Sequence, residues 1–304
     1  MATMATKTNQ VEPQQTLGSA KLREALVGYG FILLPMAVFA VWYLYPLGYA
    51  VYISFFDWGV LGKIASVGTK NYDRLFHDQY FGRALKNTLY YTVAVVPIQM
   101  TLGLLMAVIV NQKIRARAFF RAGFYFPSLA SSAAITSIFI FILNADGLLN
   151  KIVGGHRPWF GDARTALWAI VGLNAWTTSG TMMLFYLAAL QSIPTDVYEA
   201  AAVDGTSQWR TFWKITFPLL KPGHFFVAVV SVIGALKIFD QAFIVSSGTG
   251  GPDYSTLTGV LYLYRTAFTD VRFGYAATIG IALFGIIFVF TLIQRLLFGR
   301  PETA

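Results

Sequence analysis

The chain has 304 residues, of which 56% are hydrophobic and only 12% are charged, and its mean hydropathy is +0.57. Two soluble domains would fit this length, but the composition is typical of a protein embedded in lipid. The net charge of +9 therefore does not indicate a nucleic-acid partner, because basic residues gather beside membrane spans. Without cysteine, no disulfide framework, cysteine-ligated zinc or thiol chemistry is available, and three scattered histidines lack metal-ligand spacing.

Residues 1–25 are expected to form a flexible tail, because the first 20 or so are rich in Thr, Gln and Ala and contain no apolar run. They also lack the layout of a cleavable signal. The first apolar span, Leu26–Phe56, exceeds the roughly 20 residues that a bilayer needs, and Pro35 and Pro46 are expected to kink it. A loop of mixed charge, residues 57–83, separates it from the next span.

The segment Asn111–Arg121 fixes the orientation. It carries four basic residues and no acid, so the positive-inside rule places it in the cytoplasm. Counting crossings from this loop puts both termini, including a short tail at 298–304, on the cytoplasmic side. The five further predicted spans are Ala84–Val110, Phe124–Leu143, Thr165–Leu190, His224–Val245 and Tyr275–Leu297.

A polar bridge, residues 192–222, joins the fourth and fifth spans on the cytoplasmic side. It reads as two short helices, the first capped by Thr195 with Asp196 in its first turn. Gly205 suits the position after a helix end, and Ser207 can cap the second helix. Pro218 and Pro222 are expected to end that helix.

This bridge resembles the cytoplasmic loop of permease subunits in binding-protein-dependent ABC importers. The matching residues are Glu199, Ala200, Ala201, Gly205, Ile215 and Pro218, while Phe217 stands where a leucine is usual. The resemblance implies coupling helices that sit in a cleft of the ATPase subunit. Glu199 would pair with a basic group there, Gly205 would form the turn, and Asp204 would cap or pair locally.

The resemblance extends over residues 26–297. Segments 67–72, 238–240 with 250–252, and 262–275 are similar to stretches of carbohydrate permeases of the maltose and glycerol-3-phosphate importer class. It implies an all-α membrane protein of the type I importer fold, with six spans, in a bacterial inner membrane. It also implies four partners: a second homologous permease, two copies of an ATP-binding subunit, an external solute-binding protein, and a sugar or sugar-like substrate.

The chain itself has no means of binding ATP, because no phosphate-binding Gly-x-x-x-x-Gly-Lys-Ser/Thr occurs. ATP is therefore expected on the partner ATPase, with no cofactor or metal in this chain. Paired acids, a histidine cluster or a Ser/Lys dyad are also missing from the spans, which argues against an enzyme.

Polar side chains in two spans are candidates for the substrate path. Lys237 and Asp240 fall at i and i+3 and are expected to share a helix face, with Gln241 beside them. They either bind sugar hydroxyls or form a structural ion pair between subunits. The fourth span adds Asn174, Trp176 and Thr178, which either line the path or serve helix packing.

Two other kinds of transporter remain open. An ion-coupled secondary transporter would need titratable groups in its spans, and only Lys237 and Asp240 qualify. An ABC permease for a cargo other than sugar is compatible with the cytoplasmic loop, and only the fifth-span resemblance argues against it.

Overall fold

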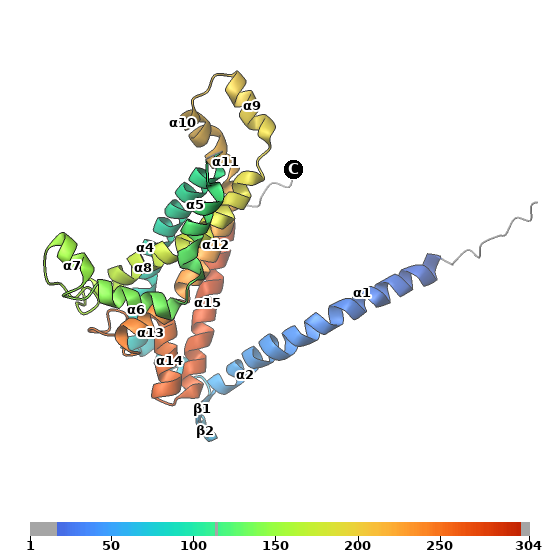
Figure 1. Ribbon diagram of the computed structural model, residues 1–304. Coiled ribbons are helices and arrows are strands. Elements are labelled where there is room, and N and C mark those ends of the chain that lie inside the picture. Colours follow the sequence, from blue (N-terminus) through green and yellow to red (C-terminus); the bar gives the residue numbers. More distant parts are fainter. Residues whose placement is uncertain (1–16, 113–114, 299–304) are drawn as a thin grey trace, which may run out of the picture. The chain divides into compact units, whose positions relative to one another are not determined.

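The computed structural model describes residues 17–112 and 115–298, which are mostly helical (Figure 1). They divide into two compact units, one made of the described residues up to 52 and the other of those from 53 on. The predicted tails lie largely outside the described residues, at 1–16 and 299–304. Helix begins at Leu17, inside the predicted N-terminal tail, because residues 20–25 are mostly strong helix formers.

The first unit is one long apolar helix with a π-helical turn. It consists of α1 (Leu17–Phe39), η1 (Ala40–Leu44) and the start of α2 (Tyr45–Ser54). Proline at position 46 has no N–H, so the carbonyl of Trp42, four residues earlier, loses its helical partner. The chain widens there into the π turn, in which the Tyr45 N–H donates to the Ala40 carbonyl.

The second unit holds all other elements. They are β1 (Phe56–Gly59), β2 (Gly62–Ser66), α3 (Lys70–His77), α4 (Gln79–Asn111), α5 (Arg117–Leu129), α6 (Ser132–Ile142), α7 (Leu148–Val153), α8 (Ala166–Gln191), α9 (Thr195–Val203), α10 (Gln208–Thr211), η2 (Phe212–Thr216), α11 (Phe217–Leu219), α12 (Lys221–Leu236), α13 (Asp240–Ser246), α14 (Gly259–Tyr264), η3 (Arg265–Thr269) and α15 (Phe273–Phe298). The strands form an antiparallel hairpin that pairs Phe56 with Ser66 and Gly59 with Gly62. This hairpin, in the predicted mixed-charge loop, is an exception to the all-α expectation.

Four helical segments of the described chain are long and apolar enough to cross a membrane: 21–54, 79–111, 221–246 and 273–297. The predicted third span would be a fifth, but it is broken, because α5 and α6 meet at 92°. Helix α8 has 26 residues and is long enough to cross, but its polar middle makes it less hydrophobic than the four segments above. The count of six spans therefore stays a prediction.

The break between α5 and α6 does not fall at Pro127, the proline inside α5. It falls at Ala130 and Ser131, which are extended, with ψ values of 150° and 130°. Helix α8 fixes α5 just before the break, since the Ser128 hydroxyl donates to the Thr177 carbonyl at 2.6 Å. An added Cβ on Gly180 would lie 2.4 Å from the Phe124 carbonyl oxygen, so the two helices touch through their backbones.

Helices α4 and α8 form the centre of the second unit. Gly103 allows their close approach, because a Cβ there would lie 2.6 Å from the Cβ of Met182. Buried apolar side chains of α4, α8 and α12 pack on both sides of this crossing, with Tyr186 and Val227 in one cluster and Val95 and Ile170 in another. This packing leaves polar side chains of the three helices facing a common cavity.

Asp78 ties α4 to the last part of the chain. Its carboxylate accepts the amides of Tyr80 and Phe81 at the start of α4 and the hydroxyls of Tyr262 and Tyr275. Burial by itself would raise the pKa of Asp78, but these four hydrogen bonds outweigh it and hold the pKa below its ordinary 3.8. The carboxylate is therefore a permanent charged acceptor at neutral pH.

Candidate functional site

The polar bridge stands at one end of the second unit, where α9 and α10 project beyond the bundle, while α6, α7, α13 and α14 lie at the other end (Figure 1). Helix α9 ends in a Schellman motif. Gly205 has a φ of +67°, its N–H donates to the Ala202 carbonyl, and the Thr206 N–H donates to the Ala201 carbonyl. The predicted conformation of Gly205 is thus confirmed, and the Thr206 hydroxyl adds a second bond to Ala201 at 2.8 Å.

The helix starts of the bridge follow the prediction only in part. Ser207 caps α10, because its hydroxyl accepts the Arg210 amide at 3.4 Å. Thr195 does not cap α9: Pro194 holds the capping position and Thr195 is the first helical residue. A proline has no side-chain oxygen for this role, so α9 starts without a side-chain cap.

The two prolines do not end the second helix of the bridge. The chain passes from η2 through α11 into α12 with one turn residue, Leu220. As at η1, the π turn lies just before a proline. Pro218 has no N–H to donate to the Lys214 carbonyl, and the Phe217 N–H donates to the Phe212 carbonyl, five residues earlier. The bridge is therefore joined to the fifth span by nearly continuous helix.

The predicted coupling residues are mostly exposed. Glu199, Ala200, Asp204, Gly205 and Pro218 face solvent. Ile215 is half-buried, and Ala201 is buried as part of the helix-ending motif.

Large apolar side chains surround these residues. Val203 is 88% exposed and Trp209 is 74% exposed, so the bridge presents an apolar surface beside Glu199. Such a surface at the tip of two short helices is suited to binding another protein.

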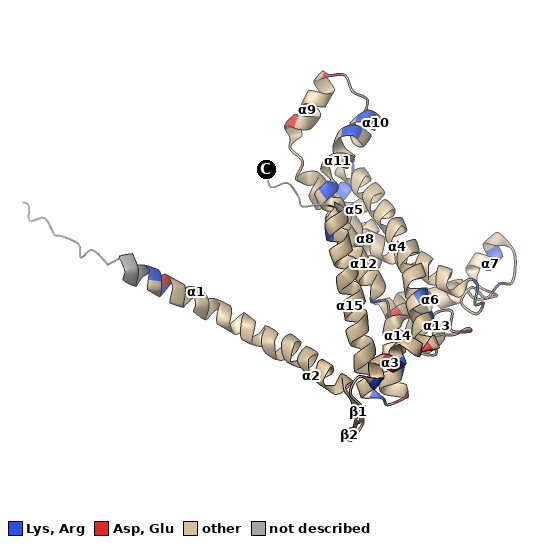
Figure 2. Ribbon diagram, turned by 180° about the vertical axis from the view of Figure 1, so that it is seen from behind, with Lys and Arg blue, Asp and Glu red and all other residues tan. Residues whose placement is uncertain are grey.

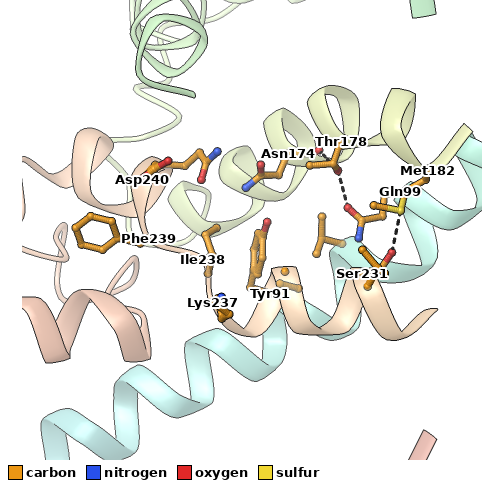
Figure 3. A pocket seen from close by; sticks show the side chains of 15 residues that line it. Tyr91, Gln99, Asn174, Thr178, Met182, Ser231, Lys237, Ile238, Phe239 and Asp240 are labelled. Carbon is orange, nitrogen blue, oxygen red and sulfur yellow. Dashed lines mark hydrogen bonds between the residues drawn. The ribbon is translucent and has the colours of Figure 1, made fainter. Parts of the chain in front are cut away.

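A cavity of about 340 Å³ lies among α4, α8, α12 and the start of α13 (Figure 3). Five of the six predicted path residues line it: Asn174, Thr178, Lys237, Asp240 and Gln241. A second cavity of about 160 Å³ on the α5 and α6 side shares Asn174, Thr178 and Gln241 with the first. The sequence therefore predicted most of one polar site whose residues come from two distant spans.

Trp176, the sixth, is elsewhere. It lies 200° around the helix from both Asn174 and Thr178 by helical periodicity, since it is two residues from each. Its ring contacts Phe139 at 5.6 Å between centroids, and the side chain is 49% exposed. Trp176 therefore does not line this cavity, and its place on the substrate path stays a prediction.

Lys237 and Asp240 do not share a helix face, because the fifth span is broken between them. Helix α12 ends at Leu236 and α13 begins at Asp240, so the expected i, i+3 relation is wrong. Tertiary contacts stabilise the break. Ile238 is buried, and its carbonyl accepts a hydrogen bond from the Thr258 hydroxyl at 3.0 Å. Within the described ranges, the ion pairs join other residues and none joins Lys237 to Asp240.

Two polar residues of α4 that line the first cavity were not predicted. Gln99 of α4 is 4% exposed and contacts Thr178 at 2.6 Å, and Tyr91 on the same helix lies beside Asn174 (Figure 3). A carboxamide in the apolar middle of the span was a signal for Gln99. Tyr91 gave none, because tyrosine is common in this chain. Gln241 is fixed from the opposite side, where its amide donates to the Ser132 hydroxyl at 2.8 Å.

These features define a class of protein: a helical membrane transport component with a polar cavity inside its spans and an exposed, partly apolar loop of two short helices at one end. Among the described residues, no group of histidine, cysteine and acidic side chains could hold a metal ion.

Comparison with known proteins identifies the family. Residues 99–302 match the family described as "Binding-protein-dependent transport system inner membrane component", and the chain belongs to it. It is thus a subunit of a transport system of the inner membrane and not an enzyme.

Proteins similar in sequence and a solved structure similar in fold agree with this family. The chain is 35% identical to the lactose transport system permease protein LacF of Rhizobium radiobacter, covering 88% of this chain and 92% of that one. It is 32% identical to the multiple sugar-binding transport system permease protein MsmF of Streptococcus mutans, with 88% and 93% covered. A bacterial ABC transporter that imports the polysaccharide alginate has the same fold, with a TM-score of 0.76, 21% identity, and coverage of 93% of this chain and 99% of that one.

Proposed function

We propose that this chain is a permease subunit of an ATP-driven importer that carries a sugar or sugar-like solute. The observation that carries the proposal is the cavity at the break of the fifth span, where amide and hydroxyl side chains meet beside Lys237 and Asp240. Sugars present many hydroxyls to such groups, and membrane spans tolerate them only where they face a cavity or one another. The sugar cargoes named for the two similar permeases support the same cargo class.

The path is completed by a second, homologous permease. Lys237 and Asp240 are exposed in this chain by itself, although both lie within an apolar span. Charged groups at this depth need a covered polar environment. A partner subunit that closes over this face of α12 would supply it and form the second wall of the path.

The polar bridge binds the ATPase subunit, of which the importer has two copies. Glu199 provides a charge for a basic group of the ATPase, and Val203 and Trp209 provide the apolar contact. Movement of α9 reaches the path through a short connection, because the Tyr198 hydroxyl contacts Thr216 at 3.3 Å and nearly continuous helix leads from there to α12. ATP binding would thereby switch the spans between inward-open and outward-open forms.

The bridge and both chain ends face the cytoplasm. In Figure 2, Lys and Arg gather on α10 and at the neighbouring helix ends, with the acidic residues of this end on and just after α9, while the opposite end carries both signs of charge side by side. This asymmetry follows the positive-inside rule. The opposite end then receives the external binding protein, and a solved complex of the alginate transporter with its substrate-bound periplasmic protein has this fold, with a TM-score of 0.77 and 21% identity.

The test is ATP hydrolysis by the assembled importer in nanodiscs. The chain is co-expressed with the permease, ATPase and binding protein encoded beside it, and lactose, maltose and raffinose are compared. One of these sugars, bound to the binding protein, is expected to stimulate hydrolysis. Glu199→Ala should reduce that stimulation at least severalfold, whereas the matched change Asp196→Ala on the same helix should leave it in place.

Two results would contradict the proposal. If no sugar stimulates hydrolysis and amino acids or peptides do, the cargo class is wrong. If the ATPase neither binds nor responds to the chain, the importer assignment fails, and proton- or sodium-driven uptake through Lys237 and Asp240 becomes the reading to test.

A further inference from the structure

The first cavity has two chemically different ends. Lys237 and Asp240 lie at one end, and Gln99, Ser231 and Met182 lie at the other (Figure 3). The second end carries no charge. Gln99 is its most polar group and is almost fully buried in α4.

The hydroxyl of Thr178 determines how the Gln99 carboxamide is turned. This hydroxyl has one proton and two oxygen atoms at 2.6 Å, the backbone carbonyl of Asn174 and the side-chain oxygen of Gln99 as it stands in Figure 3. Its proton cannot serve both. A bond to the carbonyl four residues earlier is the usual one for a threonine in a helix, so the proton goes to Asn174. The Thr178 oxygen must then accept a proton, so we assign the Gln99 carboxamide the opposite orientation to the one drawn, with its amide nitrogen donating to Thr178.

This orientation turns the Gln99 carbonyl oxygen away from Thr178. In the described part of the chain, Thr178 is the one side chain hydrogen-bonded to Gln99. The nearby Ser231 hydroxyl is directed at the Met182 sulfur at 3.2 Å, which is a weak acceptor. The carbonyl oxygen of Gln99 is thus a strong acceptor at the uncharged end of the cavity.

We propose that Gln99 binds one hydroxyl of the sugar and that Thr178 positions it. This inference rests on the proposed function and adds a specificity residue to it. The carbonyl oxygen accepts from a neutral hydroxyl, and it would repel a carboxylate or phosphate because no cation lies at this end. The uncharged end of the cavity therefore takes a neutral sugar ring, and any charged part of a substrate is confined to the end with Lys237.

The test measures recognition of single hydroxyl groups by the complete importer in proteoliposomes. The parent sugar is the one among lactose, maltose and raffinose that stimulates ATP hydrolysis most. Its uptake is compared with the uptake of its monodeoxy analogues. The binding protein is present in saturating amounts, and only analogues that the isolated binding protein still binds are used. With the wild-type chain, one analogue is expected to be taken up about 3- to 10-fold more slowly, the value of one uncharged hydrogen bond.

The variants separate contact from structure. Gln99→Met keeps the shape of the side chain and should bring that difference below about 2-fold. Thr178→Val should reduce it in part, and it serves as the test if the Gln99 variant does not assemble. Thr92→Val is the matched control: its hydroxyl is buried and bonded to Thr88 within α4, away from the cavity, so the full difference should remain.

The inference is overturned if Gln99→Met or Thr178→Val discriminates as well as the wild type, or if no analogue differs from its parent sugar in the wild type. Either result leaves the sugar-importer proposal intact. Failure of that proposal is a different observation, the absence of stimulation by any sugar.

Discussion

Replacing Gly205 by alanine isolates the backbone requirement of the bridge. The residue has a φ of +67°, and a Cβ added there would meet no atom within 4 Å. Steric collision therefore contributes nothing, and the whole effect comes from the left-handed conformation and from the freedom of the unfolded chain.

The magnitude follows from two opposing terms. The left-handed conformation costs a residue with a Cβ roughly 1–2 kcal/mol. Reduced freedom of the unfolded chain returns about 0.4–1 kcal/mol. Gly205→Ala should thus destabilise the end of α9 by about 1 kcal/mol, which is about a 5-fold change in its opening equilibrium. Gly205→Asn should have a smaller effect, because asparagine tolerates this conformation better.

Amide hydrogen exchange of the assembled importer measures this change. The reporter is the Thr206 N–H, which donates to the Ala201 carbonyl at 3.1 Å. It should exchange about 5-fold faster in Gly205→Ala, and faster by a smaller factor in Gly205→Asn. Gly285→Ala in α15, which also meets no atom within 4 Å, should leave it unchanged. Exchange at the wild-type rate in Gly205→Ala, or an equal effect of asparagine and alanine, would refute the reasoning.

Three further substitutions test the packing and the charges. Asp78→Ala should lower thermal stability by about 2 kcal/mol, because the helix cap and an acceptor for two tyrosine hydroxyls are lost. Since the folded-state pKa of Asp78 is depressed, its carboxylate should contribute fully to folding stability above about pH 3.8, and this contribution should fade as the pH falls further. Loss of this stability in the wild type near pH 6 would contradict the prediction. Gly180→Ala should destabilise the protein by roughly 1–3 kcal/mol, because the added Cβ collides with the α5 backbone. In the control Gly172→Ala, on the same helix, the added Cβ meets no atom and stability should not change. Equal melting temperatures of the two variants would exclude the close contact. Ala116→Gly should stabilise by up to about 1 kcal/mol, because Ala116 has a φ of +60°, and an unchanged melting temperature would argue against strain there.

Local chemistry explains which parts of the bridge could be predicted. A glycine after a helix end and a serine before one act within a few residues, so Gly205 and Ser207 behave as expected. Pro218 shows the limit of such rules. The chain accommodated the missing N–H by a π turn instead of ending the helix, and sequence gives no sign of which solution is chosen.

The cavity residues divide in the same way. Helical periodicity, applied residue by residue, places Trp176 on the opposite side of α8 from Asn174 and Thr178, so its absence from this cavity could have been predicted. Gln99 could have been singled out as the one glutamine of the predicted span 84–110. That it meets Thr178, 79 positions later, follows only from the close crossing of α4 and α8.

Composition and charge determined that this chain belongs in a membrane, and a few motifs indicated the family and the helix-turn-helix form of the bridge, because these properties are local or additive along the chain. The broken fifth span was decided by the tertiary structure. Residues 237–239 contain neither glycine nor proline, and the break persists because Thr258 supplies a hydrogen bond to Ile238 from 20 positions away. The break separates Lys237 from Asp240 and helps to form the cavity, so the shape of the site depends on contacts that no local pattern records.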